Sequence, residues 1–440
     1  MISRFLIAFA LTVSSLVAQE PSPNASPVPS ATPPPPKLDE VVLLPTFWDQ
    51  TVETLKPMLA ALKFSWISAA QDGARSVSPD LSLAGHHVDE AILRFSEQKP
   101  TAVQLLFYSR GLSKELNERL FDELTVNVQQ AITTQVASAP QKKARDIGSV
   151  VRADGVEWIH GPSKLSLEWS ATKNPFRAEF LRLIIRPNVE EKRAIGEVQT
   201  GNSNRAAVKQ FSGPEHVVKE NGDVKIPDVP MVDQGERGYC VVASVERVMT
   251  YYGATVDQTE LAQIANSDAG KGTSSTEMVD SLNRLTGRLG VKVRTLEQWQ
   301  YPEFLKLVED YNRAAKRAKK RVVQGGGRTL QEYYMQMEPE IYREIRLKKA
   351  SDLTKFQRDI TKNIDEGIPL LWSVNLGMVP EGKLKQYAGG HMRLIIGYNP
   401  AKQEIIYSDS WGPGHEEKRM SMEDAWVITS GLNSLQPIGS

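Results

Sequence analysis

Cys240 is the only cysteine in this 440-residue chain, and its surroundings are those of a nucleophile. It follows a glycine-bearing loop, residues 233–239, and precedes an apolar run with helical spacing, residues 241–249. A thiol at the N-terminus of a helix feels the positive end of the helix macrodipole, which favours the thiolate. Six residues upstream, Gln234 carries a side-chain amide that can donate a hydrogen bond to a developing oxyanion.

Two distant segments supply the other groups that a cysteine nucleophile needs. His391 follows two glycines and opens a strand-like run, and Asp409 follows a second such run within Ser-Asp-Ser-Trp-Gly. A lone cysteine with a distant histidine and an Asp or Asn is the sequence pattern of a catalytic thiol. In this hypothesis the thiolate attacks a carbonyl carbon, His391 gives a proton to the leaving amine, and Asp409 orients the imidazole. Water then hydrolyses the thioester.

The elements around His391 must bring it to the aspartate. Residues 391–398 and 404–408 alternate like antiparallel strands around Asn-Pro-Ala-Lys, and they predict a hairpin. Pairing Tyr398 with Gln403 places His391 opposite position 410, within about one residue of the aspartate. A purely structural His–Asp contact would fit the same pattern.

These segments resemble the motifs of papain-like cysteine peptidases. Residues 234–240 are similar to their Gln-Gly-x-x-Gly-x-Cys stretch, and residues 409–412 to their Asn-Ser-Trp-Gly segment, with His391 and an apolar strand between them. The Asp in place of Asn and the short chain between Cys and His are more similar to C39 (double-glycine) peptidases and C39-like domains. The resemblance covers roughly the last half of the chain, and it implies a papain-like fold that hydrolyses peptide bonds.

Two departures from papain leave alternatives open. Val241 follows the cysteine where papain-like enzymes carry Trp, and Asp409 also suits transglutaminase-like acyl transferases. A third alternative is a catalytically inactive papain-fold binding module. Gln234 favours the peptidase, because a side-chain donor at that spacing is the papain-like arrangement. For a peptidase we expect Asp409→Asn to cost nearer tenfold than ten-thousandfold in activity, since an amide oxygen also accepts the imidazole N–H.

The 53 basic and 53 acidic residues give zero net charge, which offers no support for nucleic acid as a partner.

The pattern of predicted helices and strands places the site in a larger α+β protein. The expected organisation is a signal peptide at 1–18, a Pro-rich linker at 19–37, an N-terminal α+β domain at 38–187, a linker at 188–224, and a C39-like papain-fold domain at 225–440 with a helical insertion at about 296–365.

The first residues predict export. Arg4 supplies a positive charge before the apolar run 5–17, which is too short for a comfortable transmembrane helix, and cleavage is expected after Ala18. The expected location is therefore periplasmic or secreted, with no stable membrane association beyond the signal peptide. The expected partner is a peptide or protein substrate, and the oligomeric state stays open.

The N-terminal region carries no predicted chemistry. Its pattern predicts mixed helices and strands, including a helix that Ser113 caps. His86, His87 and His160 are expected to be loop residues without a function, because no Cys or carboxylate lies at a metal-ligand spacing around them. We therefore expect neither a metal nor a cofactor.

Overall fold

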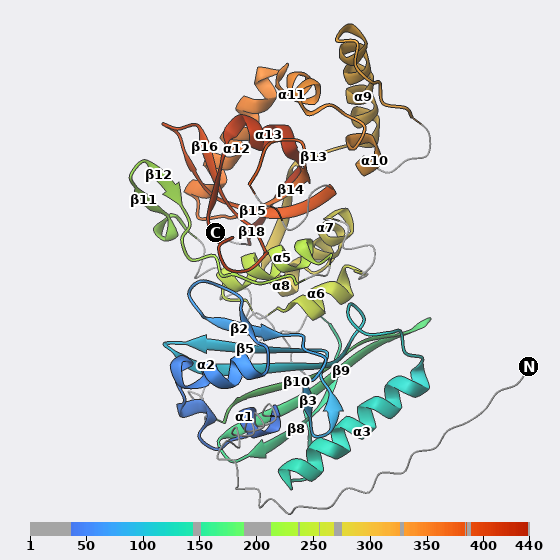
Figure 1. Ribbon diagram of the computed structural model, residues 1–440, viewed down its shortest axis with the longest axis vertical. Helices are drawn as coiled ribbons and strands as arrows, with labels where there is room; N and C mark the ends of the chain where they lie inside the picture. Colours follow the sequence, from blue (N-terminus) through green and yellow to red (C-terminus); the bar gives the residue numbers. More distant parts are fainter. Residues whose placement is uncertain are drawn as a thin grey trace, which may run out of the picture. The chain divides into compact units, whose positions relative to one another are not determined.

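The computed structural model (Figure 1) describes the following ranges: 37–143, 151–188, 213–235, 238–254, 256–267, 275–325, 330–382, 384 and 389–438. The predicted signal peptide and nearly all of the Pro-rich segment lie outside these residues. Within the described ranges, no helix combines the length and the apolar composition that crossing a bilayer requires.

An antiparallel sheet of eight strands organises the N-terminal half, in the order β1-β2-β5-β6-β10-β9-β8-β7. Its strands are β1 (Ser65–Trp66), β2 (Gly73–Ser76), β5 (Glu90–Ser96), β6 (Lys99–Ser109), β7 (Gln141–Lys142), β8 (Asp154–His160), β9 (Ser163–Lys173) and β10 (Phe176–Pro187). The helices of this half are α1 (Asp39–Val42), a 3-10 turn η1 (Phe47–Asp49), α2 (Val52–Ala61) and α3 (Glu118–Val136).

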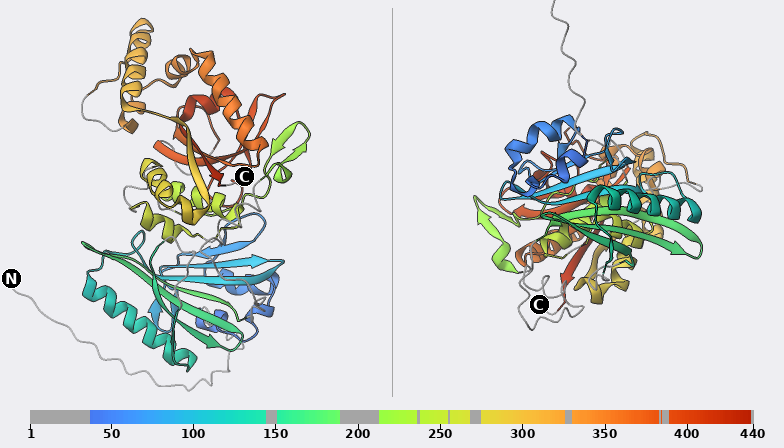
Figure 2. Two further views of the ribbon diagram at one scale, coloured as in Figure 1. Left: turned by 180° about the vertical axis from the view of Figure 1, so that it is seen from behind. Right: turned by 90° about the horizontal axis from the view of Figure 1, so that it is seen from below.

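Helix α3 lies along one face of this sheet (Figure 2). Its buried side chains recur at helical spacing, and three of them are Phe121, Val128 and Ile132. They join the apolar residues of the strands in one hydrophobic core. Periodic burial of this kind is what stabilises a helix on a sheet in water.

The predicted start of α3 was wrong. Asn117 is the N-cap, and its side-chain oxygen accepts from Leu120 N at 3.0 Å. Ser113 lies one turn earlier, where its hydroxyl oxygen accepts from Ser109 N at 2.9 Å and its hydroxyl donates to Asp89. Asn caps a helix as well as Ser does, so the cap preference alone could not choose between the two positions.

The N-terminal histidines are also not in loops. His86 and His87 form strand β4, which pairs with β3 (Ser82–Leu83), and His160 is the last residue of β8. Among the residues that the structure describes, no group of three or more His, Cys, Asp or Glu residues is placed to hold a metal ion.

A second antiparallel sheet organises the C-terminal half, with β11-β12-β15-β14-β18-β13 in order and β16 and β17 continuing from β15. Its strands are β11 (Val218–Glu220), β12 (Asp223–Lys225), β13 (Val291–Gln298), β14 (Leu370–Leu376), β15 (Gly389–Asn399), β16 (Glu404–Ser408), β17 (Lys418–Ser421) and β18 (Thr429–Pro437). The sheet thus begins with a hairpin, β11 and β12, inside the segment expected as a linker, and β12 pairs with β15.

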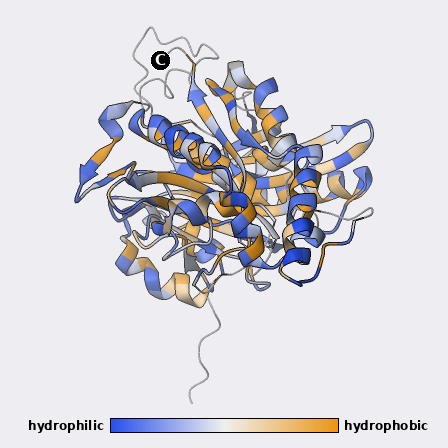
Figure 3. Cartoon of the chain, turned by 90° about the horizontal axis from the view of Figure 1, so that it is seen from above, coloured by the Kyte–Doolittle hydropathy of each residue, from blue (hydrophilic) through white to orange (hydrophobic). Residues whose placement is uncertain are grey.

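The helices of this half surround that sheet. They are α5 (Cys240–Tyr251), α6 (Gln258–Ile264), α7 (Ser275–Arg284), α8 (Thr286–Leu289), α9 (Tyr301–Arg317), α10 (Leu330–Tyr334), α11 (Pro339–Leu347), α12 (Ala350–Asp365) and α13 (Met422–Ile428), with a 3-10 turn η2 at Pro214–His216. Hydrophobic and hydrophilic residues interleave along the helices and strands of the chain (Figure 3). The predicted insertion at 296–365 corresponds to the run from α9 to α12, but strand β13 continues to Gln298 before it.

Candidate active site

Cys240 is the first residue of α5, as the sequence predicts. The helix is 12 residues long, and its side chains from Val241 to Met249 are all buried, which fixes it against the core. Tyr252 is its C-cap, and Gly253 follows with φ of 74°, a conformation that glycine adopts without strain. The thiol is half-buried, and it lies at the positive end of the helix dipole.

His391 and Asp409 form a fully buried pair. His391 Nε2 donates to Asp409 Oδ1 at 2.6 Å, and neither side chain is exposed. The other ring nitrogen, Nδ1, is also buried, and a hydrogen bond from the imidazole to the Cys240 side chain is among the contacts that raise the pKa of His391. The sequence prediction that the fold brings this imidazole and this carboxylate together matches the geometry.

The pair is charged. Burial lowers the pKa of His391, but the charge of Asp409, the hydrogen bond to it and the side chain of Cys240 outweigh burial and raise the pKa to about 9. Burial raises the pKa of Asp409, but His391 and Arg393 outweigh it and lower the pKa to about 2. His391 is therefore an imidazolium at neutral pH, and Cys240 is close enough to contribute to that state.

The predicted register of the hairpin was wrong by about two residues. The last pair before the turn is Asn399 with Glu404, and the pairing shifts at a bulge between Ile395 and Gly397. The four-residue turn leaves Gln403 at φ of 52°, which no local preference of Gln predicts. The pairing of β15 with β16 ends at Leu394 and Ser408, three residues short of His391. The chain after Ser408 then brings Asp409 to the imidazole.

Gln234 is tied to the segment that carries the aspartate. Gln234 N donates to Ser410 O at 3.0 Å, and the Ser410 hydroxyl donates to Gln234 Oε1 at 2.6 Å. The amide oxygen is thus held as an acceptor, which makes the NH₂ group the end that donates. Gln234 is buried, so its orientation is set by these contacts.

Arg247, which the sequence analysis missed, joins three parts of the site. From the middle of α5 it donates to Pro230 O at 2.7 Å, to Asp409 O at 3.1 Å and to the Ser408 hydroxyl. The side chain is buried, and burial lowers its pKa to about 10, against the opposing charge of Asp409. The nucleophile helix and the aspartate segment are therefore locked to each other by one guanidinium.

Arg393, also missed, contacts the second oxygen of the aspartate. Its Nε donates to Asp409 Oδ2 at 3.0 Å, and its Nη2 forms an ion pair with Glu381 Oε2 at 2.9 Å. Strand residues two apart share a face, so His391 and Arg393 project to the same side of β15. A His-x-Arg alternation in an otherwise apolar strand is the signal that could have identified it.

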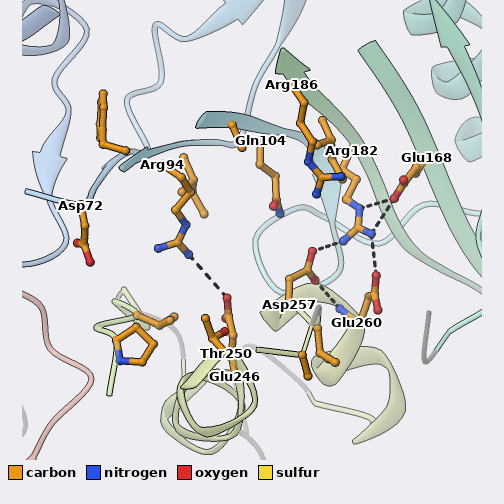
Figure 4. A pocket seen from close by; sticks show the side chains of 18 of the residues that line it. Asp72, Arg94, Gln104, Glu168, Arg182, Arg186, Glu246, Thr250, Asp257 and Glu260 are labelled. Carbon is orange, nitrogen blue, oxygen red and sulfur yellow. Dashed lines mark hydrogen bonds and ion pairs between the residues drawn. The ribbon is translucent and has the colours of Figure 1, made fainter. Parts of the chain in front are cut away.

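A charged pocket of about 450 Å³ lies elsewhere in the molecule (Figure 4). On one side, Arg94 of β5 contacts Glu246 of α5 at 3.7 Å. On the other, Arg182 of β10 binds three acids, namely Glu168 at 2.7 Å, Glu260 at 2.8 Å and Asp257. None of the four predicted catalytic residues lines this pocket.

Burial raises the pKa of two carboxyl groups that line this pocket. Desolvation raises the pKa of Glu246 to about 8, with Arg94 opposing the rise. Desolvation likewise raises the pKa of Glu260 to about 7, against the charge of Arg182. Glu246 Oε2 has no hydrogen-bond partner among the described residues, so the neutral acid is the form that burial favours.

Residues 226–434 match the family model described as the Peptidase_C39 like family. Among solved structures, xylellain, a cysteine protease from Xylella fastidiosa, is similar at 11% identity and a TM-score of 0.26, over 53% of this chain and 89% of that one. No curated protein matches the sequence. The C-terminal half of the chain is a C39-like domain.

Proposed function

We propose that this protein is an exported cysteine peptidase that hydrolyses peptide bonds through Cys240, His391 and Asp409, with Gln234 as an oxyanion donor. The observation that carries the proposal is the buried His391–Asp409 hydrogen bond of 2.6 Å. The side chain of Cys240 also raises the pKa of this imidazole. An imidazolium beside a thiol at a helix N-terminus is the arrangement that stabilises a thiolate nucleophile.

The proposed reaction has two steps. The Cys240 sulfur attacks the carbonyl carbon of the scissile bond, and His391 gives its proton to the leaving amine. Water attacks the resulting thioester and gives a proton to the now neutral His391, and the C–S bond breaks to release the acid and regenerate the Cys240 thiolate. In both steps the tetrahedral oxyanion accepts from the Gln234 NH₂ and the Cys240 backbone N–H. One such donor contributes about 10²–10³ in rate.

Two features of the site support these roles. The Asp409 carboxylate accepts the Nε2 proton of His391, which leaves Nδ1 as the ring nitrogen for the thiol. The hydrogen bonds between Gln234 and Ser410 couple the oxyanion donor to the residue next to Asp409. The four residues therefore depend on one connected set of contacts.

The test is the reactivity of the thiol in the full chain. An ordinary thiol is only about 0.3% ionised at pH 6, whereas a thiolate–imidazolium pair reacts there. We expect iodoacetamide to modify native Cys240 at pH 6, and we expect His391→Ala to abolish that rapid reaction. His86→Ala, in strand β4, is the matched control that should leave the rate unchanged. Modification only after denaturation would refute a catalytic thiol.

The reaction class needs a second measurement. We expect mass spectrometry of a peptide library to show fragments that Cys240→Ala does not produce. Conjugates with an added amine, instead of fragments, would mean an acyl transferase of the transglutaminase-like kind. If Cys240→Ala retained the protein's full biological activity, the domain would be a binding module.

Export needs a separate test. Mass spectrometry of the protein recovered outside the cytoplasm should give the mass of a chain that begins at Gln19, since cleavage is expected after Ala18.

A further inference from the structure

Both oxygens of the Asp409 carboxylate are used by hydrogen-bond donors. Oδ1 accepts from His391 Nε2 at 2.6 Å and from Ser410 N at 3.0 Å. Oδ2 accepts from Arg393 Nε at 3.0 Å. The side chains of His391, Arg393 and Asp409 are completely buried, so water cannot replace any of these partners.

An asparagine at position 409 cannot satisfy the same donors. Its side chain offers one oxygen and one NH₂ group. With the oxygen toward His391, the NH₂ meets Arg393 Nε–H; after a flip, it meets His391 Nε2–H and Ser410 N–H. Either orientation puts two donors against each other in a buried site, where an unsatisfied polar group is costly.

We propose that Arg393 is a positioning residue of the catalytic site, which fixes the Asp409 carboxylate against His391 and makes a carboxylate obligatory at that position. This proposal rests on the proposed function only where peptide cleavage is the quantity measured. Arg393 acts on His391 through Asp409. Its other ion pair, with Glu381 Oε2 at 2.9 Å, and its place 4.8 Å above the ring of Tyr407 hold the guanidinium still.

This geometry changes the expectation for Asp409→Asn. Papain-like relatives were the reason to expect a loss nearer tenfold than ten-thousandfold. Because Arg393 adds a second buried donor here, we now expect a loss of at least about 100-fold, the upper range for removing a group that orients a catalytic residue. The chain would tolerate asparagine only if the guanidinium were also replaced.

Arg393→Gln is the replacement that tests this dependence. A glutamine carries no charge, and its side-chain oxygen can accept from the NH₂ of an asparagine at position 409. In the double variant Arg393→Gln/Asp409→Asn, the asparagine NH₂ therefore donates to the glutamine oxygen. The asparagine oxygen stays free to accept from His391.

The experiment compares four full-length proteins: the wild type, Asp409→Asn, Arg393→Gln and the double variant. The readouts are kcat/KM on one peptide and the rate at which iodoacetamide modifies Cys240 between pH 4 and 9. We expect Arg393→Gln to lose about tenfold, Asp409→Asn at least about 100-fold, and the double variant to regain at least about tenfold over Asp409→Asn. The alkylation rates at pH 6 should follow the same order.

A matched control uses another arginine that contacts an aspartate in the same domain. Arg419 binds Asp223 at 2.6 Å, on strands β17 and β12, outside the triad. Arg419→Gln should not rescue Asp409→Asn. Arg393→Lys keeps a buried donor and the positive charge, and it is the variant to use if Arg393→Gln does not fold. It should also fail to rescue Asp409→Asn.

The outcomes separate the two proposals. If Asp409→Asn loses less than about threefold, or if a folded double variant is no better than Asp409→Asn, the role of Arg393 is refuted while the peptidase stands. If wild-type Cys240 is reactive at pH 6 with the predicted order among variants, but no peptide is cleaved, the peptidase is refuted and the role of Arg393 stands. An unreactive native thiol refutes both.

Discussion

The indole of Trp411 stacks on the imidazole of His391, with ring centroids 4.5 Å apart and an angle of 19° between the planes. Trp411 is buried, so its ring covers one face of the imidazole that hydrogen-bonds to Asp409. A hydrogen bond between charged groups is stronger where water is excluded. The stacked indole therefore protects the ion pair from solvent.

Removing that cover should weaken the pair. We expect Trp411→Ala to lower kcat/KM by about 10–100-fold and to shift the pKa of His391 away from about 9, because admitted water relieves the burial of the imidazolium and screens the charge of Asp409. Trp411→Phe keeps an aromatic cover and should retain most of the activity. The pKa of the imidazole can be followed by NMR of the His391 ring protons. An unchanged titration in a folded Trp411→Ala protein would show that the indole only packs.

The stability that His391 contributes should depend on pH with a definite sign. The pKa of His391 is raised from an ordinary value of 6.5 to about 9 in the folded protein, so folding favours the protonated ring. This contribution is complete below pH 6.5 and is lost as pH rises through 9, at up to about 1.4 kcal/mol per pH unit. The pKa of Asp409 is lowered to about 2, so its contribution is present above pH 3.8 and is lost as pH falls through 2.

Urea unfolding of the wild type and His391→Gln can measure this dependence. The difference in unfolding free energy between the two should be greatest near pH 5 and should shrink steadily from pH 7 to 9. His160→Gln, at the end of β8 in the other half of the chain, serves as the control. A difference that stayed constant across that range would mean that His391 is neutral in the folded protein.

Arg247 should be needed for both folding and catalysis. Arg247→Met leaves three acceptors without their donor, namely the buried Asp409 O and Ser408 hydroxyl oxygen and the partly buried Pro230 O. An unsatisfied buried group costs about 1–3 kcal/mol, and we expect a loss of at least about 2 kcal/mol in unfolding free energy. Thermal unfolding by circular dichroism checks this, and Arg343→Met, on the half-exposed pair with Glu423, should cost less than about 1 kcal/mol.

The sequence pattern predicted the nucleophile helix and the segments around His391 and Asp409 well, for a physical reason. Apolar spacing reports which face of an element is buried, and α5 and β15 are buried elements. The pattern did not predict the hairpin register, because a bulge at Ile395 and a left-handed Gln403 depend on tertiary contacts. It also did not reveal Arg247, since a buried arginine on a helix has the same local signature as an exposed one, whereas Arg393 could have been found from its place two residues after His391 in an apolar strand.

The last prediction concerns Glu246, whose pKa burial raises from 4.5 to about 8, against the charge of Arg94. The unfolded chain releases this proton near pH 4.5, whereas the folded protein keeps it to about pH 8. Between these values the folded state binds more protons, so its stability falls as pH rises, by up to about 1.4 kcal/mol per pH unit. Above pH 8 both states are ionised, and the penalty stays constant.

Glu246→Gln removes the titration and keeps the shape of the side chain. We expect this variant to unfold at higher urea concentration than the wild type at pH 8, by a margin that narrows toward pH 5. Glu123→Gln, an exposed acid on α3, should show no such dependence. Arg94→Gln removes the opposing charge at 3.7 Å, so it should raise the pKa of Glu246 further and lower stability at pH 8. Equal stability of Glu246→Gln and the wild type at every pH would mean that water reaches the carboxylate and that Glu246 is ionised in the folded protein.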